Sequence, residues 1–494
     1  MAVFFGTSDP KQSNKISRAV TANKARKIAP KVYTDDLTTP IEDIVRRHRL
    51  EIVAHFYPGA VISHRSAIET NVSPRGKLHL TLPGAAQPKR ILPGLEIRIW
   101  NGPAAQPDDI QTSFGTGMGL YTASQPRALL ENMQIARARA DDETKTLSQE
   151  ELDRWIDRQI RVFGPAWLDQ TLSQAETVAQ RLGWNREYGE LTALVTAFKS
   201  ASSPIHLVTD VAQARARGTP FDPERMTLFG LLHARLAVES FRALPRMPAE
   251  EVDNRAFWEA YFSNYIEGTK FTVEEAHAIV YNPTAAKDIN RKRPHDAHDI
   301  AETHRLIIDP NISVELPKSA DSFIELIKRR HARMMSSRLD VAPGVFKALP
   351  NSVGSHTFVL PAMVEETLRR GLPAVYNLPT ATARAFYMLF LVSEVHPFND
   401  GNGRISRLCM NAELEAAGQA RLIIPTSFRT DYLGVLGALS LRSDPDPFVA
   451  FAHKMIGING QIPFGSFEKS HEHFKKTGAM NEAPGTFDIS PFAL

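Results

Sequence analysis

Two apolar segments joined by a short polar loop constrain the fold of this chain more than any other feature. Residues 382–395 are largely apolar and contain no helix-breaking residue, and the apolar pattern returns at residues 405–417. Such segments predict two helices that are buried in a core. The glycines Gly401 and Gly403 then stand at the start of the second helix. We therefore expect a tight loop between two core helices near residue 400.

The composition is that of an ordinary folded protein. The chain has 494 residues, of which 43% are hydrophobic and 23% charged, and this length indicates about three domains. A mostly disordered chain, a collagen-like fibre and a coiled-coil rod are excluded. The net charge is +3, so any basic surface must be local. The single cysteine, Cys409, excludes an intramolecular disulfide framework and a cysteine-based zinc site.

No targeting or membrane segment is expected. The N-terminal sequence MAVFFGTSDPKQ has too short an apolar run for a signal peptide and no basic region before it. No stretch approaches the roughly 18 apolar residues of a membrane-spanning helix. The sequence therefore predicts a soluble, cytoplasmic protein that does not contact a membrane.

The loop between the two apolar segments carries the groups of an anion site. Gly401, Asn402 and Gly403 let successive backbone N–H groups turn inward, because glycine accepts positive φ angles. Such groups at a helix N-terminus bind phosphate. Arg404 and Arg407 are three residues apart, so they share one face of the new helix and can each bind phosphate oxygens.

Two further residues of the loop fit phosphate chemistry. Asp400 precedes the glycines and suits a hard cation, most simply Mg²⁺ that bridges phosphates. His396 is the nearby group whose ordinary pKa suits proton transfer near neutral pH. Base, carboxylate, anion site and arginines together indicate phosphoryl or nucleotidyl transfer from a nucleotide.

Residues 396–407 read HPFNDGNGRISR and resemble the signature of the Fic family, HPFx(D/E)GNGRxxR, at every fixed position. The similarity of organisation covers roughly residues 250–455. The resemblance implies an all-helical core and the transfer of AMP from ATP to a Ser, Thr or Tyr hydroxyl of a protein. Gly403 follows the AMP-transferring pattern, because the phosphorylating Doc branch has lysine at that position.

The resemblance also implies a role for each residue of the motif. His396 would deprotonate the target hydroxyl, Phe398 would pack in the core, and Asp400 would bind Mg²⁺. The other motif residues would hold the phosphates of ATP: Gly401, Asn402 and Gly403 the α- and β-phosphates, Arg404 and Arg407 the β- and γ-phosphates.

A shorter motif upstream, SNYIEG at residues 263–268, resembles the Fic inhibitory-helix pattern (S/T)xxxE(G/N). Residues 256–266 are expected to form a helix that ends at Gly268. Ser263 and Glu267 are four residues apart and so lie on one face. The resemblance implies that Glu267 pairs with Arg407 in place of the γ-phosphate, so that ATP binds in a non-productive pose.

Two other segments are assigned by the same resemblance. Residues 344–346 and 357–360 flank a turn and are expected to form the family's flap, a β-hairpin that holds the target segment by main-chain pairing. Tyr432 lies in the region where family members place a tyrosine and an asparagine near the adenine, but no asparagine is evident here. The choice of nucleobase is therefore less defined than the phosphate chemistry.

The first 57 residues are expected to form a basic, winged-helix-like segment. Helices are predicted over residues 13–28 and 41–56, with a short strand at 31–33 between them. The basic residues of this segment have Asp9 as their acidic neighbour: Lys11, Lys15, Arg18, Lys24, Arg26, Lys27 and Lys31. The pattern favours DNA binding, and the alternative is a solvated basic face on a small helical domain.

Residues 58–140 are expected to form a small α+β domain. Residues 77–82 and 95–100 alternate apolar and polar side chains as half-buried strands do, residues 119–122 form a third candidate strand, and Pro126 begins a helix. The segment PGAVISHRSAI at 58–68 resembles the AbiEi-type antitoxin and regulator family. That resemblance implies a winged helix followed by an α+β domain, with DNA binding or self-regulation.

The sequence thus predicts a multidomain α+β chain with an all-helical Fic core. The expected parts are a winged-helix-like segment at 1–57, an α+β domain at 58–140, a helical connector at 141–222, a Fic domain at 223–460 with its inhibitory helix near 256–268, and a poorly ordered tail at 461–494. Family behaviour suggests a homodimer through the helical core.

The predicted activity is that of a protein adenylyltransferase which Glu267 inhibits. Two alternatives remain open. The first is a DNA-binding regulator with a repressed Fic domain. The second is an enzyme that removes AMP from a modified protein, with Glu267 orienting the water. Another nucleotide donor, such as UTP, is a variant of the main prediction.

Overall fold

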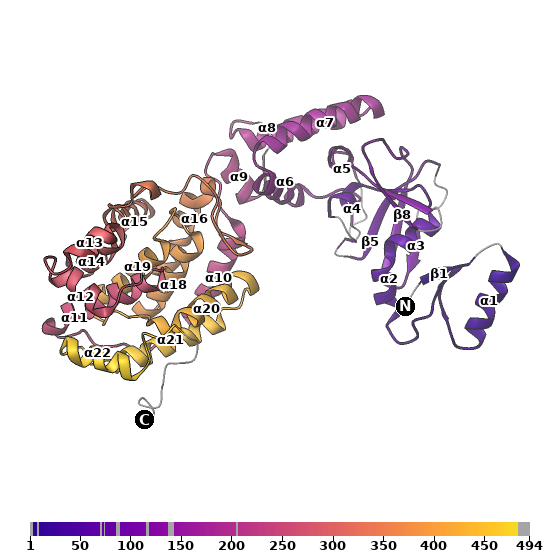
Figure 1. The fold of residues 1–494 in the computed structure, drawn as a ribbon. Coiled ribbons are helices and arrows are strands. Elements are labelled where there is room, and N and C mark those ends of the chain that lie inside the picture. Colours follow the sequence, from indigo (N-terminus) through magenta and orange to yellow (C-terminus); the bar gives the residue numbers. More distant parts are fainter. Residues whose placement is uncertain are drawn as a thin grey trace. The chain divides into compact units, whose positions relative to one another are not determined.

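The computed structural model describes residues 3–6, 9–69, 72–73, 75–84, 89–114, 118–136, 143–203 and 206–482. The chain forms two compact units, Met1–Gly218 and Thr219–Leu494, and each contains hydrophobic cores of its own. Figure 1 shows their elements. No helix among the described residues is both long enough and apolar enough to cross a lipid bilayer.

The first unit begins with a three-stranded antiparallel sheet in the order β1-β3-β2. Its elements are β1 (Val3–Phe5), α1 (Pro10–Thr21), β2 (Arg26–Ala29), β3 (Val32–Thr34), α2 (Ile41–Arg47) and α3 (Arg49–Phe56). The helix predicted over 13–28 is wrong in its second half. The chain turns at Asn23, which has a positive φ of 53°, and continues as strand β2.

A six-stranded mixed sheet follows, in the order β6-β7-β5-β4-β9-β8. Its strands are β4 (Val61–Ile62), β5 (Lys77–Thr81), β6 (Lys89–Leu92), β7 (Leu95–Trp100), β8 (Ile110–Phe114) and β9 (Met118–Thr122). The pairs β5–β7 and β4–β9 are parallel and the others are antiparallel. The three strands predicted from the sequence are therefore confirmed as β5, β7 and β9, with α5 (Gln125–Asn132) after them.

The predicted winged-helix segment does not form a core of its own. Ile44 of α2 and Ile52 of α3 belong to the same hydrophobic cluster as Leu78 and Ile97 of the six-stranded sheet. None of the residues of α1, all of which the structure describes, is buried. The segment is thus part of a larger α+β unit.

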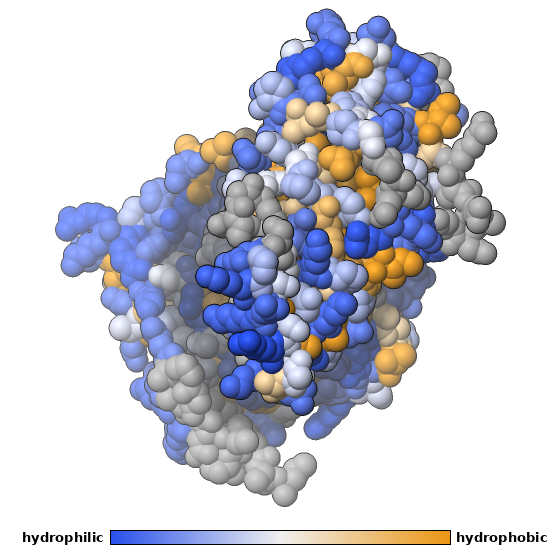
Figure 2. Space-filling model, turned by 90° about the vertical axis from the view of Figure 1, so that its right-hand side faces the viewer, coloured by the Kyte–Doolittle hydropathy of each residue, from blue (hydrophilic) through white to orange (hydrophobic). Residues whose placement is uncertain are grey.

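On the face that Figure 2 shows, the hydrophobic side chains lie in small separate groups. Two of the most exposed, Ile91 and Ile110, lie on the edge strands β6 and β8. Exposed apolar residues of this scattered kind are normal in folded proteins.

The first unit is completed by helices α4 (His64–Glu69), α6 (Gln149–Phe163), α7 (Ala166–Leu182), α8 (Asn185–Lys199) and α9 (Asp210–Ala216).

The second unit is mostly helical. Its helices are α10 (Pro223–Ala237), α11 (Ala249–Ile266), α12 (Val273–Tyr281), α13 (Lys287–Lys292), α14 (Pro294–Ile308), α15 (Ala320–Met334), α16 (Val364–Gly371), α17 (Pro373–Tyr376), α18 (Ala381–Val395), α19 (Asn402–Ala416), α20 (Arg429–Arg442), α21 (Asp446–Asn459) and α22 (Phe467–Lys476), with short 3₁₀ turns at Leu339–Val341, Pro361–Met363 and Thr426–Phe428.

Helices α18 and α19 are the centre of this unit, as the apolar segments predicted. Nearly every residue of α18 is buried, and Leu389, Phe390 and Leu391 are fully shielded from solvent. A helix that is apolar on all sides must be surrounded by other helices. The C-terminus of α18 and the N-terminus of α19, which residues 396–401 connect, are therefore fixed by packing in the hydrophobic core.

The hairpin and the C-terminal tail differ from the sequence expectation. A two-stranded hairpin is present, but it is shorter than predicted: β10 (Ser352–Val353) pairs with β11 (His356–Thr357), and residues 344–346 are not a strand. Gly354 makes the turn with a φ of 59°. The predicted poorly ordered tail contains helix α22, whose Phe474 lies in the hydrophobic core; residues 483–494 of that tail lie outside the described residues.

Candidate active site

The loop between α18 and α19 is shaped by two residues with left-handed backbone conformations. His396 ends α18 with a φ of 53°, and Gly401 precedes α19 with a φ of 75°. A positive φ is uncommon for a residue with a side chain and is found most often where a site requires it. This turn directs the His396 ring and the N-terminus of α19 into the same region.

Side chains of the loop fix its shape from within. Asn402 accepts a hydrogen bond from the Phe398 N–H at 2.8 Å and donates one to the Phe398 carbonyl at 2.9 Å. Phe398 is fully buried and stacks on His331 of α15, with ring centroids 3.8 Å apart. His331 in turn contacts the Asp400 carbonyl oxygen through Nε2 at 3.0 Å. The loop is therefore held by contacts with the protein's own side chains.

His396 has an unprotonated ring nitrogen at the cavity. Its Nδ1 lies 3.2 Å from the carbonyl oxygen of Ser393, which can only accept, so Nδ1 carries the proton and Nε2 has the free lone pair. Phe358 stacks on the ring at 3.8 Å. Burial lowers the pKa of His396 to about 4, and the charge of Lys347 acts in the same direction. The imidazole is therefore neutral at pH 7.

Arg407 is held by the motif that the sequence singled out upstream. Its Nη2 donates to Glu267 Oε1 at 2.7 Å and to the Ser263 carbonyl at 2.8 Å, and its Nε donates to Ser263 Oγ at 3.0 Å. Burial alone would lower the pKa of Arg407, but the neighbouring charge of Glu267 raises it overall. Its buried Nη1 finds no hydrogen-bond partner among the described residues.

Gly403 provides the space that Glu267 occupies. A Cβ atom at position 403 would lie 2.1 Å from Glu267 Oε1 and 3.1 Å from Arg407 Nη1. Because these contacts are shorter than van der Waals distances, any side chain there would displace the carboxylate. The Glu267 carboxylate thus packs directly against the first turn of α19.

Arg404 has surroundings different from those the sequence predicted. Its Nη1 donates to Asp299 Oδ2 of α14 at 2.8 Å and to Asn264 Oδ1 of α11 at 3.2 Å, and the side chain is buried. Arg404 is not among the described residues that line the cavity at this site. Arg404 thus links α19 to α11 and α14, whereas Arg407 faces the cavity.

Asp400 leaves one side of its carboxylate open. Oδ1 accepts the Gly401 N–H at 2.6 Å, Oδ2 is 3.6 Å from Arg404, and 47% of the side chain is exposed. Mg²⁺ commonly takes one or two protein carboxylates and completes its shell with water and substrate phosphates. Asp400 fits that role as a single protein ligand.

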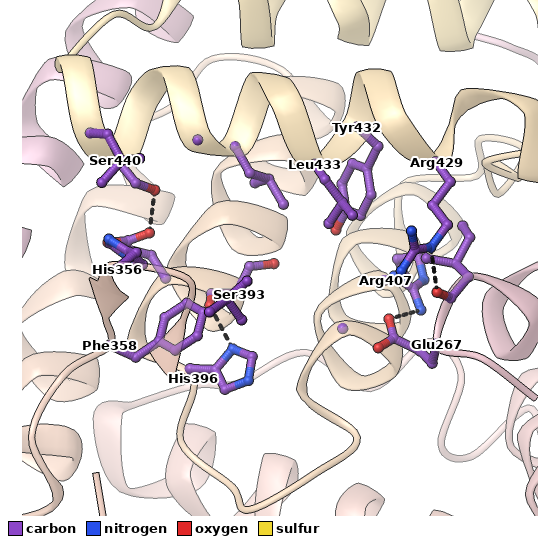
Figure 3. Close-up of a pocket in the computed structure, with 17 residues that line it drawn as sticks. Glu267, His356, Phe358, Ser393, His396, Arg407, Arg429, Tyr432, Leu433 and Ser440 are labelled. Carbon is purple, nitrogen blue, oxygen red and sulfur yellow. Dashed lines mark hydrogen bonds and ion pairs between the residues drawn. The ribbon is translucent and has the colours of Figure 1, made fainter. Parts of the chain in front are cut away.

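A cavity of about 390 Å³ brings these residues together. Figure 3 shows α20 above it, Glu267 and Arg407 at one end, and His396 and Phe358 lower down towards the other end. Of the predicted site residues, four line it: Glu267, His396, Gly403 and Arg407. Tyr432, which the sequence analysis placed near the adenine, lines the cavity as well. Ser263, Gly268, Asp400, Gly401, Asn402 and Arg404 are not among its described lining residues.

The opposite end of the cavity contains residues that the sequence reasoning missed. Glu394 is buried on α18, two residues before His396, and lies 2.8 Å from Arg225 Nε of α10 and 3.3 Å from His356 Nε2 of the hairpin. Ser440 Oγ of α20 donates to the same carboxylate. No sequence signal connects these four residues, because they come from four elements.

Lys347 is another residue at the site that no sequence motif indicated. It is buried beside the loop, where its N–H donates to the Pro397 carbonyl at 2.9 Å and its Nζ donates to Asn351 Oδ1 at 2.6 Å. Burial lowers the pKa of Lys347 to about 7. Asn351 donates to the Phe398 carbonyl at 3.1 Å, so both residues tie the base of the hairpin to the loop.

Comparison with known proteins agrees with this geometry. Residues 322–414, which include the loop, match the family model described as the Fic/DOC family. The chain carries a Fic domain. Among curated proteins, "Protein adenylyltransferase fic-1" of Caenorhabditis elegans is 26% identical over 255 residues, 50% of this chain and 48% of that protein. "Protein adenylyltransferase Fic" of Drosophila melanogaster is 30% identical over 211 residues, 40% of this chain and 41% of that protein.

The chain spans about half or less of the length of these curated relatives. Among solved structures, "Fic-1 (aa134 - 508)" of Caenorhabditis elegans aligns with a TM-score of 0.35 at 18% identity, over 66% of this chain and 88% of that chain. A Fic domain containing signaling protein of Bacteroides thetaiotaomicron aligns with a TM-score of 0.33 at 20% identity, over 54% of this chain and 99% of that chain.

Proposed function

We propose that this protein is an adenylyltransferase which moves AMP from ATP to a hydroxyl side chain of a protein. The observation that carries the proposal is the shared cavity. His396 and Arg407 line one space next to the N-terminus of α19. His396 is neutral with the lone pair of Nε2 free, and the buried Nη1 of Arg407 has no hydrogen-bond partner in the described part of the chain. A base and an anion site in one cavity are what nucleotidyl transfer requires.

In the proposed step, the target hydroxyl oxygen forms a bond to the α-phosphorus of ATP. The bond from that phosphorus to the oxygen that bridges it to the β-phosphorus breaks, and pyrophosphate leaves. His396 Nε2 takes the hydroxyl proton. The N–H groups at the start of α19 and the Arg407 guanidinium stabilise the negative charge on the phosphates. Mg²⁺ held by Asp400 would supply further positive charge to the same phosphates.

We further propose that Glu267 inhibits this reaction. Its carboxylate uses the Arg407 donor that an outer phosphate would need, and it lies against Gly403 at the start of the anion-binding turn. A hydrogen bond between charged groups contributes about 1.5–3 kcal/mol, which corresponds to roughly 10- to 100-fold in an equilibrium. Removing the carboxylate should raise the rate by a factor of this order.

The test is transfer of label from α-labelled ATP with Mg²⁺ to proteins of a cell lysate. We expect weak labelling by the wild type, labelling stronger by roughly 10- to 100-fold with Glu267→Gly, and none with Glu267→Gly/His396→Ala. The double variant should still bind ATP, because His396 is not part of the anion site. Folded proteins that bind ATP and yet give no label in any lane would refute the proposal.

Removal of AMP from a modified protein is the second candidate. Glu267 is 27% exposed within the cavity that also holds His396, so water reaches its carboxylate. A carboxylate in that position can orient a water molecule for attack on the α-phosphorus. This second function predicts that Glu267→Gly loses release of AMP from a labelled target.

Five further properties stay predictions from the sequence: the nucleobase, the target residue, DNA binding by the basic N-terminal segment, a homodimer and a cytoplasmic location.

A further inference from the structure

The helix that leads to Glu267 presents one of its sides to arginines of the core. Glu259, Ser263 and Glu267 follow one another at intervals of four residues, so they lie along one line on and just beyond α11. Glu259 accepts two hydrogen bonds from Arg421, at 2.7 and 2.8 Å. Ser263 and Glu267 bind Arg407. This side fixes where Glu267 stands when α11 is in place.

Another side of α11 is covered by the C-terminal segment of the chain. Trp258 stacks on Phe467 of α22 with centroids 5.5 Å apart and an interplanar angle of 11°, and it meets Phe474 at 4.7 Å. Phe262, one helical turn further, meets Phe474 edge to face at 5.0 Å. Trp258, Phe262 and Phe474 are at most 1% exposed. Figure 1 shows α22 beside α11.

Polar contacts secure the same segment at both ends of α11. Near the start of the helix, the Asn254 amide donates to the Phe464 carbonyl at 2.7 Å. Near its end, the Tyr265 hydroxyl donates to Glu482 Oε1 at 2.9 Å, and Lys270 Nζ lies 2.7 Å from the same oxygen. Tyr265 is two residues from Glu267. The segment 464–482 therefore contacts α11 along its whole length, up to the inhibitory residue.

We infer that residues 464–482, which we call the C-terminal brace, keep Glu267 on Arg407, and that displacing this brace activates the enzyme. The inference rests on the proposed function. Without the brace, the rings of Trp258 and Phe262 would be exposed to water, so α11 would lose the packing that fixes its end. The Glu267 carboxylate is then held mainly by Arg407, and the outer phosphate of ATP competes for that same donor.

The brace can be weakened without touching the site. Phe474→Ala removes the ring that contacts both Trp258 and Phe262. Glu482→Ala removes the ion pair and the Tyr265 hydrogen bond, and because this side chain is 54% exposed the fold does not depend on it. The matched control is Phe229→Ala, which removes an equally buried phenylalanine whose ring contacts are with Tyr387 and Phe390 of α18.

Labelled-AMP transfer by the full chain is measured in two backgrounds, with Glu267 and with Glu267→Gly. In the Glu267 background we expect Phe474→Ala to raise transfer about tenfold, within the usual range of coupling between sites, and Glu482→Ala to raise it by a smaller factor. In the Glu267→Gly background neither should raise it further. Phe229→Ala should raise transfer in neither background.

Unchanged or lower transfer in both brace variants, while Glu267→Gly is active, would overturn the brace but leave the proposed function intact. Inactive Glu267→Gly would instead refute the proposed function. Hydrogen exchange of the amides at 263–269 then decides the brace by itself. Faster exchange in Phe474→Ala and Glu482→Ala than in Phe229→Ala supports it, and equal exchange overturns it.

Discussion

At the scale of single residues, the site separates groups that hold the loop from groups that face the cavity. Asn402 and Phe398 hold the loop through hydrogen bonds and stacking, and neither lines the described cavity. His396 and Arg407 face it. The first pair therefore determines geometry, and the second determines chemistry. Substitution of either kind should reduce activity, but a change in the first pair also reduces stability.

The pH dependence of transfer follows from the burial of His396. Its pKa is lowered from 6.5 to about 4, so the folded protein has a neutral base throughout the neutral range. The charge of Glu267 raises this pKa, so its removal in Glu267→Gly lowers the pKa further. The rate of Glu267→Gly should therefore be flat between pH 6 and 8 and fall only at about pH 4 or below. An inflection near pH 6.5 would contradict this expectation.

The same residue makes stability depend on pH in a defined direction. Between pH 4 and 6.5 the unfolded chain binds the His396 proton and the folded chain does not. Stability is therefore fully present above pH 6.5 and is lost as the pH falls towards 4. His331, whose pKa burial also lowers to about 4, acts in the same direction. Urea unfolding at each pH separates this loss from the change in rate.

Arg404 shows what residue spacing can and cannot predict. A separation of three residues correctly places Arg404 and Arg407 on neighbouring positions of α19. It does not reveal that Asp299, more than a hundred residues earlier, lies next to Arg404. The motif therefore predicted which residues gather at the site, but not which of them reach the cavity.

At the scale of elements, a buried carboxylate links helix α14 to helix α19. Asp299 of α14 is fully buried, and its Oδ2 accepts hydrogen bonds from Arg404 of α19 and from Arg338, both at 2.8 Å. Removal of one partner from a buried ion pair leaves an uncompensated charge and costs about 3–5 kcal/mol.

Asp299→Ala should therefore lower the free energy of unfolding by about 3–5 kcal/mol in urea titrations. The matched control is Asp288→Ala, because Asp288 is 84% exposed and pairs with Arg291 at 4.0 Å. That change should cost at most about 1 kcal/mol. Unchanged stability of Asp299→Ala, with a raised KM for ATP, would show that Arg404 serves the nucleotide instead.

Elements with strong local patterns could be predicted, and those that depend on distant partners could not. The apolar segments became α18 and α19, and the alternating segments became β5, β7 and β9. Strand β8 was missed because all but one of its residues are exposed, which leaves no apolar alternation to detect. The hairpin at 352–357 has two residues in each strand and takes its position from Arg225, which bonds the Thr357 carbonyl.

At the scale of the whole molecule, the two units have separate cores. One cluster runs from Leu228 to Ala479, and the other two lie between Val3 and Ala212. Cores that share no residues can unfold separately. Calorimetry should therefore show two transitions.

Substitution in one core should then shift one transition. Phe390→Ala, at a fully buried position in the second unit, should lower one midpoint through a loss of about 3–5 kcal/mol. Ile97→Ala, at a fully buried position in the first unit, is the matched control and should lower the other. A single transition that moves with either substitution would contradict separate unfolding.

Glu267 fills the space that any side chain at position 403 would need. A side chain at 403 would overlap the Glu267 carboxylate in its present place on Arg407, so the carboxylate would have to move to admit it. Loss of the carboxylate, in contrast, leaves position 403 free to vary. Variation at position 403 is therefore tied to the placement of the Glu267 carboxylate, and a new side chain there would weaken the inhibition that we propose for Glu267.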